Sequence, residues 1–82
     1  MSPQQIKGVV VATLQSIAPE VEAEELIADR PLRSQVDLDS MDWLNFLIGL
    51  HTALKVDIPE ADYARLVTLN DLVNYLQQRC PA

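Results

Sequence analysis

The sequence is poor in the residues that disulfide, metal and phosphate-loop chemistry require. Among its 82 residues there is one cysteine, Cys80, and one histidine, His51, so an internal disulfide is impossible and these two residues show no metal-ligand spacing between them. The two glycines, Gly8 and Gly49, fall inside predicted helices, which excludes a glycine-rich phosphate loop. We expect no metal site, an incidental free thiol at Cys80 and a solvated helix residue at His51.

Positive charge and long apolar runs are also scarce. The chain has six Lys and Arg residues and twelve Asp and Glu residues, which gives a net charge of −6. A nucleic-acid binder needs clustered basic side chains instead. The apolar run at residues 9–12 is too short for a membrane span or a secretory signal. We therefore expect a cytoplasmic monomer that binds no nucleic acid and does not insert stably into membranes.

The patterns that are present predict an all-α fold. Apolar residues make up 49% of the chain, enough for one core, and the length suits a single domain over residues 1–82. Helical periodicity and capping residues predict helices at about 3–17 and 40–54, and a last helix that begins after Thr68. A short helical turn is expected between Pro59 and Leu66. The expected fold is a small helical bundle of three main helices plus one short helix.

Residues 18–38 show no sustained period and predict a long connection. Long connections inside compact domains often serve a function. Acidic residues concentrate around it, which suggests partners with basic surfaces. These acids are Glu20, Glu22, Glu24, Glu25, Asp29, Asp37, Asp39 and Asp42. Apolar residues expected to pin the connection to the core are Leu26, Ile27, Leu32, Val36 and Leu38.

The apolar residues of helix 40–54 fall on two faces. Those expected on the core face are Phe46, Leu47, Leu50 and Leu54, with Trp43 beside them as a half-buried core residue or a neighbour of the functional site. Met41, Leu44 and Ile48 lie about a third of a turn away. One face is enough for a core, so the second predicts a docking surface for partner proteins. Packing of this second face against the long connection is the alternative.

The segment Leu38-Asp39-Ser40-Met41-Asp42 carries the clearest motif. Ser40 and His51 lie eleven residues apart on one helix, too far to hydrogen-bond, so a catalytic triad is improbable. The segment resembles the acyl carrier protein family, in which Asp-Ser-Leu or Asp-Ser-Met begins the second helix. Residues 56–60 and 66–69 resemble the family's Ile-Pro segment and the capped start of its last helix. The resemblance runs from residue 40 to residue 76 without a gap.

This resemblance implies a non-catalytic carrier whose serine receives 4′-phosphopantetheine from coenzyme A. Ser40 would be the attachment residue, with Asp39 beside it, and a phosphodiester there would meet the unpaired N–H groups of a helix start. The implied partners are a phosphopantetheinyl transferase and acyl-loading, synthase or transferase enzymes. The implied partner contacts are Met41, Asp42, Leu44 and Ile48. The implied lining of an acyl cavity is Phe46, Leu47, Leu50, Ile58, Leu66 and Leu72.

The second helix departs from the family pattern. Fatty-acid carriers place several acids along it, whereas this chain has Asn45, His51 and Thr52 at such positions and retains Asp42. This difference favours a dedicated carrier of a lipid or specialised, secondary-metabolite-type pathway. Because D-alanyl carriers also use Asp-Ser-Met, an aminoacyl carrier is an alternative. A helical interaction module that is never modified is another.

Overall fold

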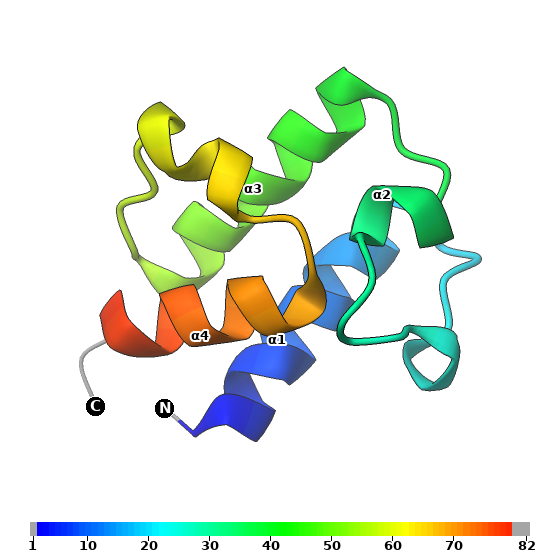
Figure 1. Ribbon diagram of the computed structural model, residues 1–82, viewed down its shortest axis with the longest axis horizontal. Helices are drawn as coiled ribbons and strands as arrows, with labels where there is room; N and C mark the ends of the chain where they lie inside the picture. Colours follow the sequence, from blue (N-terminus) through cyan, green and yellow to red (C-terminus); the bar gives the residue numbers. More distant parts are fainter. Residues whose placement is uncertain (1, 80–82) are drawn as a thin grey trace.

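The computed structural model describes residues 2–79, so the expectation for Cys80 lies outside the described residues (Figure 1). Its elements, in chain order, are α1 (Pro3–Ile17), η1 (Ala23–Glu25), α2 (Leu32–Gln35), α3 (Ser40–Leu54), η2 (Glu60–Arg65) and α4 (Leu69–Arg79), where η denotes a 3₁₀ helix. The all-α prediction is confirmed, and α1 and α3 have the predicted bounds. Among residues 2–79, no helix combines the length and apolar composition that crossing a bilayer requires.

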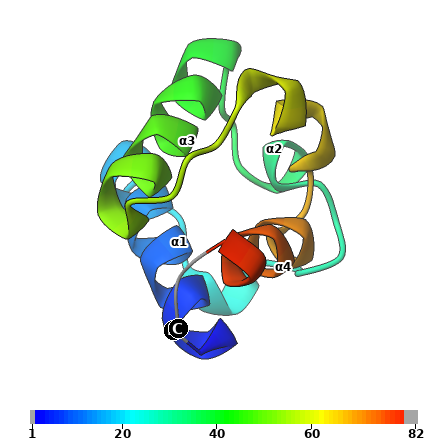
Figure 2. The same ribbon diagram turned by 90° about the vertical axis from the view of Figure 1, so that its left-hand side faces the viewer.

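The three main helices are arranged around α1, which packs against both α3 and α4. The short elements α2 and η2 close the side of the bundle between α3 and α4 (Figure 2). The expected short helix after Pro59 is η2. The sequence predicted only this one short helix, whereas the structure has two more, η1 and α2, inside the 18–39 connection. Elements of three or four residues are too short to show a hydrophobic period, so the sequence pattern could not reveal them.

Capping side chains fix where α1 and α4, the first and last helices of the chain, begin. Ser2 and Gln5 form a reciprocal box at α1: the Gln5 N–H donates to Ser2 Oγ at 3.2 Å, and the Ser2 N–H donates to Gln5 Oε1 at 3.0 Å. Thr68 and Asp71 do the same at α4, with bonds of 3.0 and 3.1 Å. Each box satisfies N–H groups that have no partner within the helix, and the loss of such a cap costs about 1 kcal/mol.

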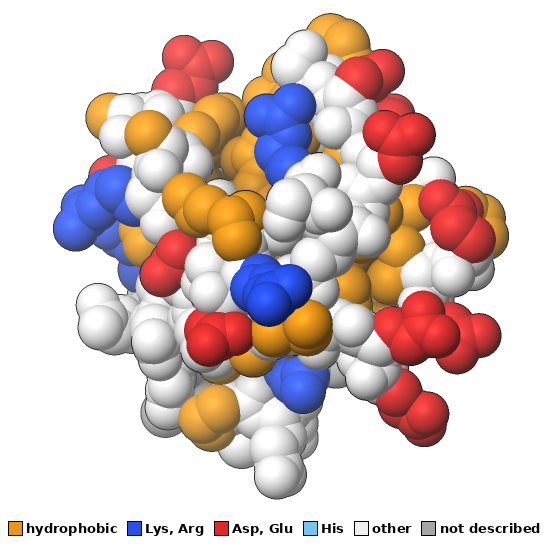
Figure 3. Space-filling view, turned by 45° about the vertical axis from the view of Figure 1, so that its right-hand side comes forward, with side chains coloured by type: hydrophobic (Ala, Val, Ile, Leu, Met, Phe, Trp, Pro, Cys, Tyr) orange, Lys and Arg blue, Asp and Glu red, His pale blue; other side chains and the backbone are white. Residues whose placement is uncertain are grey.

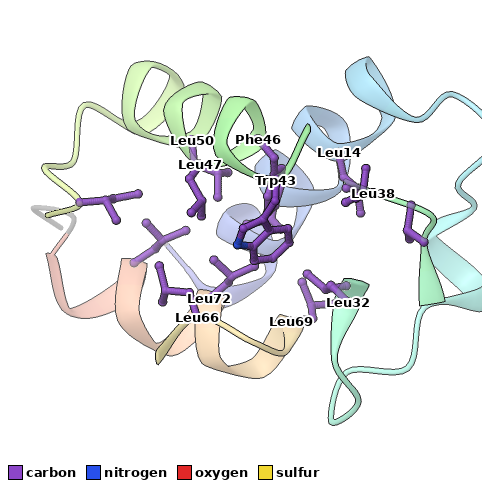
Figure 4. Close-up of a cluster of buried hydrophobic side chains, with 14 of the residues drawn as sticks. Leu14, Leu32, Leu38, Trp43, Phe46, Leu47, Leu50, Leu66, Leu69 and Leu72 are labelled. Atoms are coloured by element: carbon purple, nitrogen blue, oxygen red, sulfur yellow. The ribbon is translucent and has the colours of Figure 1, made fainter. Parts of the chain in front are cut away.

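The core is assembled from one face of each main helix (Figure 4). Its largest fully buried side chains come from α1, α3, α4 and α2: Ile6, Val10, Leu14, Leu32, Phe46, Leu47, Leu50, Leu69, Leu72 and Leu76. Burying one such aliphatic or aromatic side chain contributes about 1.5–3 kcal/mol. Because no internal disulfide is possible, this packing supplies most of the stability.

The 18–39 connection is held to the bundle by backbone as well as side-chain contacts. Leu32, Val36 and Leu38 are buried as predicted, and Leu26 is half-buried. The Leu32 N–H donates to the Val67 carbonyl at 2.9 Å, and the Asn70 N–H donates to the Ala28 carbonyl at 3.0 Å. These bonds join α2 and the preceding loop to the start of α4.

Ile27 does not pin the connection with its side chain, contrary to the prediction, since that side chain is 45% exposed. Ile27 is held by its backbone instead. Its N–H donates to Gln35 Oε1 at 2.7 Å, and its carbonyl accepts from Gln35 Nε2 at 2.9 Å. Because the backbone supplies the attachment, the side chain is free to point outward.

Candidate functional site

Ser40 is the first residue of α3, and its side chain is exposed. The segment before it alternates between buried and exposed positions: Val36 and Leu38 are buried, whereas Asp37 and Asp39 are exposed. The two buried side chains anchor this segment in the core. The chain therefore emerges at Asp39 and presents the Ser40 hydroxyl to solvent.

Asp39 caps α3 from an extended conformation, with φ −79° and ψ 178°. Its Oδ1 accepts a hydrogen bond of 2.8 Å from the Asp42 N–H, and its carbonyl accepts the first helical bond, of 3.0 Å, from the Trp43 N–H. The remaining N–H groups of the first turn and the positive end of the helix dipole lie beside Ser40. This location suits a negatively charged group attached to the serine oxygen.

Trp43 fixes the first turn of α3 to the core. Its side chain is 9% exposed, so it is more deeply buried than the half-buried position expected of it. Its ring centroid lies 5.2 Å from that of Phe46, with the ring planes tilted by 40° (Figure 4). A tilted aromatic pair of this kind is a favourable packing arrangement. One turn from Ser40, the chain is therefore held rigidly.

The second apolar face of α3 is largely uncovered. Met41 is 64% exposed and Ile48 is 49% exposed, whereas Leu44 and Asp42 are half-buried. The 18–39 connection therefore leaves both ends of this face open to solvent. Exposed apolar side chains at helical spacing next to Ser40 form a surface that another protein could cover.

The six residues expected to line an acyl cavity come together inside the core: Phe46, Leu47, Leu50, Ile58, Leu66 and Leu72. They are between 0% and 7% exposed, and five of them are labelled in Figure 4. Leu47 and Ile58 also reach a surface hollow of about 180 Å³ beside His51. Access to the other side chains from this surface would require α3 and the segment after it to move apart.

A second hollow, of about 260 Å³, lies beside the first turn of α3, and we call it the Arg33 hollow. It is lined by Pro31, Arg33, Trp43, Tyr63, Ala64, Leu66 and Val67. Sequence reasoning singled out Trp43 as a neighbour of the site but missed Arg33 and Tyr63. These side chains come from α2 and η2, and nothing in the local pattern of either segment indicates that they meet.

Acidic side chains gather on another face. A hollow of about 280 Å³ is lined by Glu20, Glu22, Glu25 and Asp37 together with Val21, Leu26, Gln35 and Val36. Figure 3 shows several acidic side chains along the right-hand side of this view, where no basic side chain is seen. Within residues 2–79, the His, Cys, Asp and Glu side chains form no group of three or more that could hold a metal ion.

Comparison with known proteins shows which family the chain belongs to. Residues 9–76 match the family described as the phosphopantetheine attachment site, PP-binding. The chain belongs to this family of carrier proteins. The match spans most of the chain and includes all of α3 and its first-turn serine.

Several bacterial acyl carrier proteins are similar to this carrier over most of their length. The acyl carrier protein of Campylobacter jejuni subsp. jejuni (strain 81-176) is 31% identical over 71 residues, which cover 87% of this chain and 86% of the relative. That of Campylobacter fetus subsp. fetus (strain 82-40) is 32% identical over 73 residues, covering 88% and 87%. That of Desulforapulum autotrophicum is 23% identical over 74 residues, covering 90% and 91%.

A phosphopantetheine carrier is not itself a catalyst. The covalent 4′-phosphopantetheine supplies the thiol that forms the thioester, so the chain needs no nucleophile of its own. The start of α3 fits this group, because Ser40 offers an exposed hydroxyl and Asp39 caps the helix beside it. Modifying and acyl-processing enzymes must contact this carrier for the arm to be attached and loaded.

His51 lies at the other end of α3 and has a structural contact that the sequence did not predict. The residue is exposed, as expected, but its Nδ1 lies 2.7 Å from the Val56 carbonyl oxygen. A carbonyl can only accept, so Nδ1–H donates this bond. The bond ties the turn after α3 to the helix, where Lys55 adopts a left-handed conformation with φ 55° and ψ 41°.

Proposed function

We propose that this carrier holds acyl intermediates as thioesters on a 4′-phosphopantetheine arm at Ser40, and presents them to enzymes of a lipid or specialised biosynthetic pathway. The observation that carries the proposal is the exposed Ser40 at the start of α3, where the Asp39 carboxylate caps the first turn. The first-turn N–H groups would stabilise the phosphodiester, and Trp43 would hold this turn in place.

The proposed docking surface for partner enzymes is the second face of α3, made of Met41, Asp42, Leu44 and Ile48. Its support is the exposure of Met41 and Ile48 and its position beside Ser40. Further along α3 this region carries Asn45, His51 and Thr52 and no carboxylate. Partners would therefore recognise mainly apolar and uncharged contacts, which favours enzymes dedicated to one pathway.

The proposed resting place of a long acyl chain is the core region around Phe46, Leu47, Leu50, Ile58, Leu66 and Leu72. Its support is that these apolar side chains all belong to the one buried core cluster. Because five of the six are at most 2% exposed, a chain would enter only when the surrounding helices separate. Short acyl groups would remain outside.

Attachment can be tested by incubating the protein with coenzyme A and a broad-specificity phosphopantetheinyl transferase. We expect intact-mass spectrometry to show the gain of one arm and peptide mapping to place it on Ser40. Ser40→Ala should abolish the gain, whereas Ser34→Ala, a matched change of another exposed serine, should leave it unaltered. Modification of the Ser40→Ala variant at another serine would overturn the assignment. No modification of the wild type would favour an unmodified interaction module.

An aminoacyl carrier is the second candidate, favoured by the Asp39-Ser40-Met41 tripeptide, which D-alanyl carriers share. The two candidates differ in the group on the thioester. Intact-mass analysis of the protein recovered from its native cells, before and after thioester cleavage with hydroxylamine, would identify that group. A released fatty or other acyl hydroxamate supports the first proposal, and a released aminoacyl hydroxamate supports the second.

A further inference from the structure

The hollow beside His51 contains polar groups that the proposed function leaves unused. We call it the His51 hollow, and its volume is about 180 Å³. It is lined by Leu47, Ile48, His51, Asp57, Ile58 and Tyr63. Leu47 and Ile58 are 1% and 7% exposed and supply an apolar floor, whereas His51 and Asp57 are exposed at its rim. The hollow therefore offers one imidazole and one carboxylate beside apolar surface.

The bond from His51 to the turn after α3 decides what the ring can offer in this hollow. Because the Val56 carbonyl accepts from Nδ1–H at 2.7 Å, the proton of the neutral ring is held on Nδ1, and Nε2 can only accept. A second proton leaves the bond to Val56 in place, since Nδ1–H still donates. It turns Nε2 into a donor and gives the ring a positive charge. Protonation therefore changes the charge of the hollow without releasing the turn.

The charges around His51 favour a cationic ligand while the ring is neutral. The other titratable groups in the lining are Asp57, its one carboxylate, and Tyr63, whereas Lys55 and Glu60 lie outside it. A Lys or Arg side chain fits such a hollow, because its aliphatic stem packs on apolar surface while its charged head stays near solvent. Two acceptors, the carboxylate and Nε2, then face one donor head. Once protonated, the ring would repel this head and offset the charge of Asp57.

The His51 hollow continues the second face of α3. His51 follows Leu44 by seven residues and Ile48 by three, which places all three on one side of the helix, and Ile48 also lines the hollow. Eleven residues, about 16 Å along the axis, separate His51 from Ser40. An ordinary interface buries about 800 Å² on each partner, a patch roughly 28 Å across. An enzyme that acts on Ser40 and covers the second face therefore reaches the hollow.

We propose that the His51 hollow receives a Lys or Arg side chain of the transferase that modifies Ser40, and that it does so while His51 is neutral. Asp57 pairs with the cationic head, Nε2 of His51 accepts a hydrogen bond from it, and Ile58 contacts the stem. This inference rests on the proposed function and adds a chemical feature of its modifying partner. Because exposed ion pairs contribute little, we expect protonation of His51 to weaken docking about two- to fivefold.

The test follows modification of the carrier as pH changes. The probe is a broad-specificity phosphopantetheinyl transferase with coenzyme A, and kcat/KM for the carrier is measured between about pH 5.5 and 8.5, the range in which histidine titrates. Each value is divided by that of His51→Gln at the same pH, so that titrations within the enzyme cancel. His51 is the one histidine of the chain, and glutamine keeps a neutral acceptor there. We expect this ratio to fall about two- to fivefold from the alkaline to the acidic end of the range.

Matched variants assign the effect to the hollow. His51→Lys fixes a positive charge there and should lower kcat/KM at every pH. Gln77→Lys adds the same charge to an exposed residue of α4, outside the hollow, and should not lower it. Asp57→Asn removes the carboxylate and should lower kcat/KM about two- to fivefold at alkaline pH. All of these replaced side chains are exposed, so melting curves should confirm an unchanged fold.

Three outcomes would overturn the inference. The ratio of wild type to His51→Gln could stay constant with pH, Gln77→Lys could lower kcat/KM as much as His51→Lys, or Asp57→Asn could leave it unchanged. The second result would make net charge, rather than the hollow, the cause. Mass spectrometry separates these failures from failure of the proposed function. A wild type that gains no arm refutes attachment at Ser40, whereas a wild type that is modified with no effect of His51 protonation refutes only the role of the hollow.

Discussion

The Tyr75 hydroxyl donates a 2.6 Å hydrogen bond to Oδ2 of Asp62 and so joins α4 to η2. Arg79 Nη2 lies 3.4 Å from the same oxygen, and its guanidinium stacks 4.3 Å above the Tyr75 ring. Arg65 approaches the other carboxylate oxygen at 3.6 Å. We call these four residues the Asp62 cluster. Because η2 supplies Tyr63 and Ala64 to the Arg33 hollow, the Asp62 cluster also fixes one wall of that hollow.

The first prediction concerns the stability that this bond supplies. Tyr75→Phe removes the hydroxyl and leaves the half-buried Asp62 carboxylate with its two arginines. Hydrogen bonds to charged groups are worth about 1.5–3 kcal/mol, and partial exposure reduces this, so we expect a loss of about 1 kcal/mol in urea unfolding. Tyr63→Phe is the control, since Tyr63 lies outside the Asp62 cluster. Equal losses in the two variants would contradict a special role for Tyr75.

A second prediction concerns alkaline pH. Partial burial, and then the hydrogen bond to Asp62, raise the pKa of Tyr75 above its usual value near 10, although Arg79 opposes the shift. The folded protein therefore keeps the phenol proton to higher pH than the unfolded chain does. The stability from this difference is complete below about pH 10 and is lost as pH rises through the folded-state pKa. Unfolding followed across this range should show a smaller decline in Tyr75→Phe than in wild type.

The third prediction concerns the contact between α1 and α3. A Cβ atom on Gly49 would lie 2.8 Å from Thr13 Cγ2. Thr13 cannot easily rotate away, since it is β-branched and its hydroxyl donates to the Val9 carbonyl at 2.8 Å. Overpacking of this kind destabilises a protein by about 1–3 kcal/mol, whereas the better helix propensity of alanine stabilises it by about 1 kcal/mol. The net effect of Gly49→Ala should therefore be a destabilisation of about 1 kcal/mol.

Two further variants check this reason. Thr13→Ser removes Cγ2 but keeps the hydroxyl, so it should restore most of the stability of Gly49→Ala. Gly8→Ala is the control, because nothing lies within 4 Å of a Cβ atom at that position. It should stabilise the protein by up to about 1 kcal/mol. A double variant no more stable than Gly49→Ala alone would show that Thr13 is not the obstacle.

A fourth prediction concerns docking on the second face of α3. Met41→Ser and Ile48→Ser change exposed side chains, so each should alter the free energy of unfolding by no more than about 0.5 kcal/mol. Burial of such a side chain in an interface contributes about 1.5–3 kcal/mol, so affinity for a partner enzyme should fall by about tenfold or more. Leu50→Ala, in the core, should instead destabilise by about 2–5 kcal/mol. If Met41→Ser and Ile48→Ser both left the affinity for the partner enzyme unchanged, partners would dock on another surface.

The fifth prediction concerns the acidic face. If Glu22 and Glu25 attract a basic modifying enzyme, then changing both to glutamine should slow its association at low salt. The difference from wild type should disappear at high salt, where surface charges are screened. Glu60→Gln, on η2, tests whether net charge alone matters. Association rates that do not depend on salt would rule steering out.

The helices and their caps could be read from the sequence because they depend on neighbours along the chain. The Ser2–Gln5 and Thr68–Asp71 boxes join residues three apart, and so does the Asp39 cap at α3. Helical periodicity likewise repeats within one element, which is why α1 and α3 were predicted with their observed bounds. Ser40 could be singled out for the same reason, since its motif is continuous in sequence.

The features that the sequence did not reveal join residues from distant segments. The Ile27 attachment joins a loop to α2, the Asp62–Tyr75 bond joins η2 to α4, and the Arg33 hollow brings residues of α2, α3 and η2 together. Packing is decided by the shapes of buried side chains across the whole core, and no local pattern records it. By itself, then, the sequence determined the three main helices, their caps and the exposed serine at the start of α3. Only the tertiary structure decided which side chains surround that serine, because separate segments meet there only when the core forms.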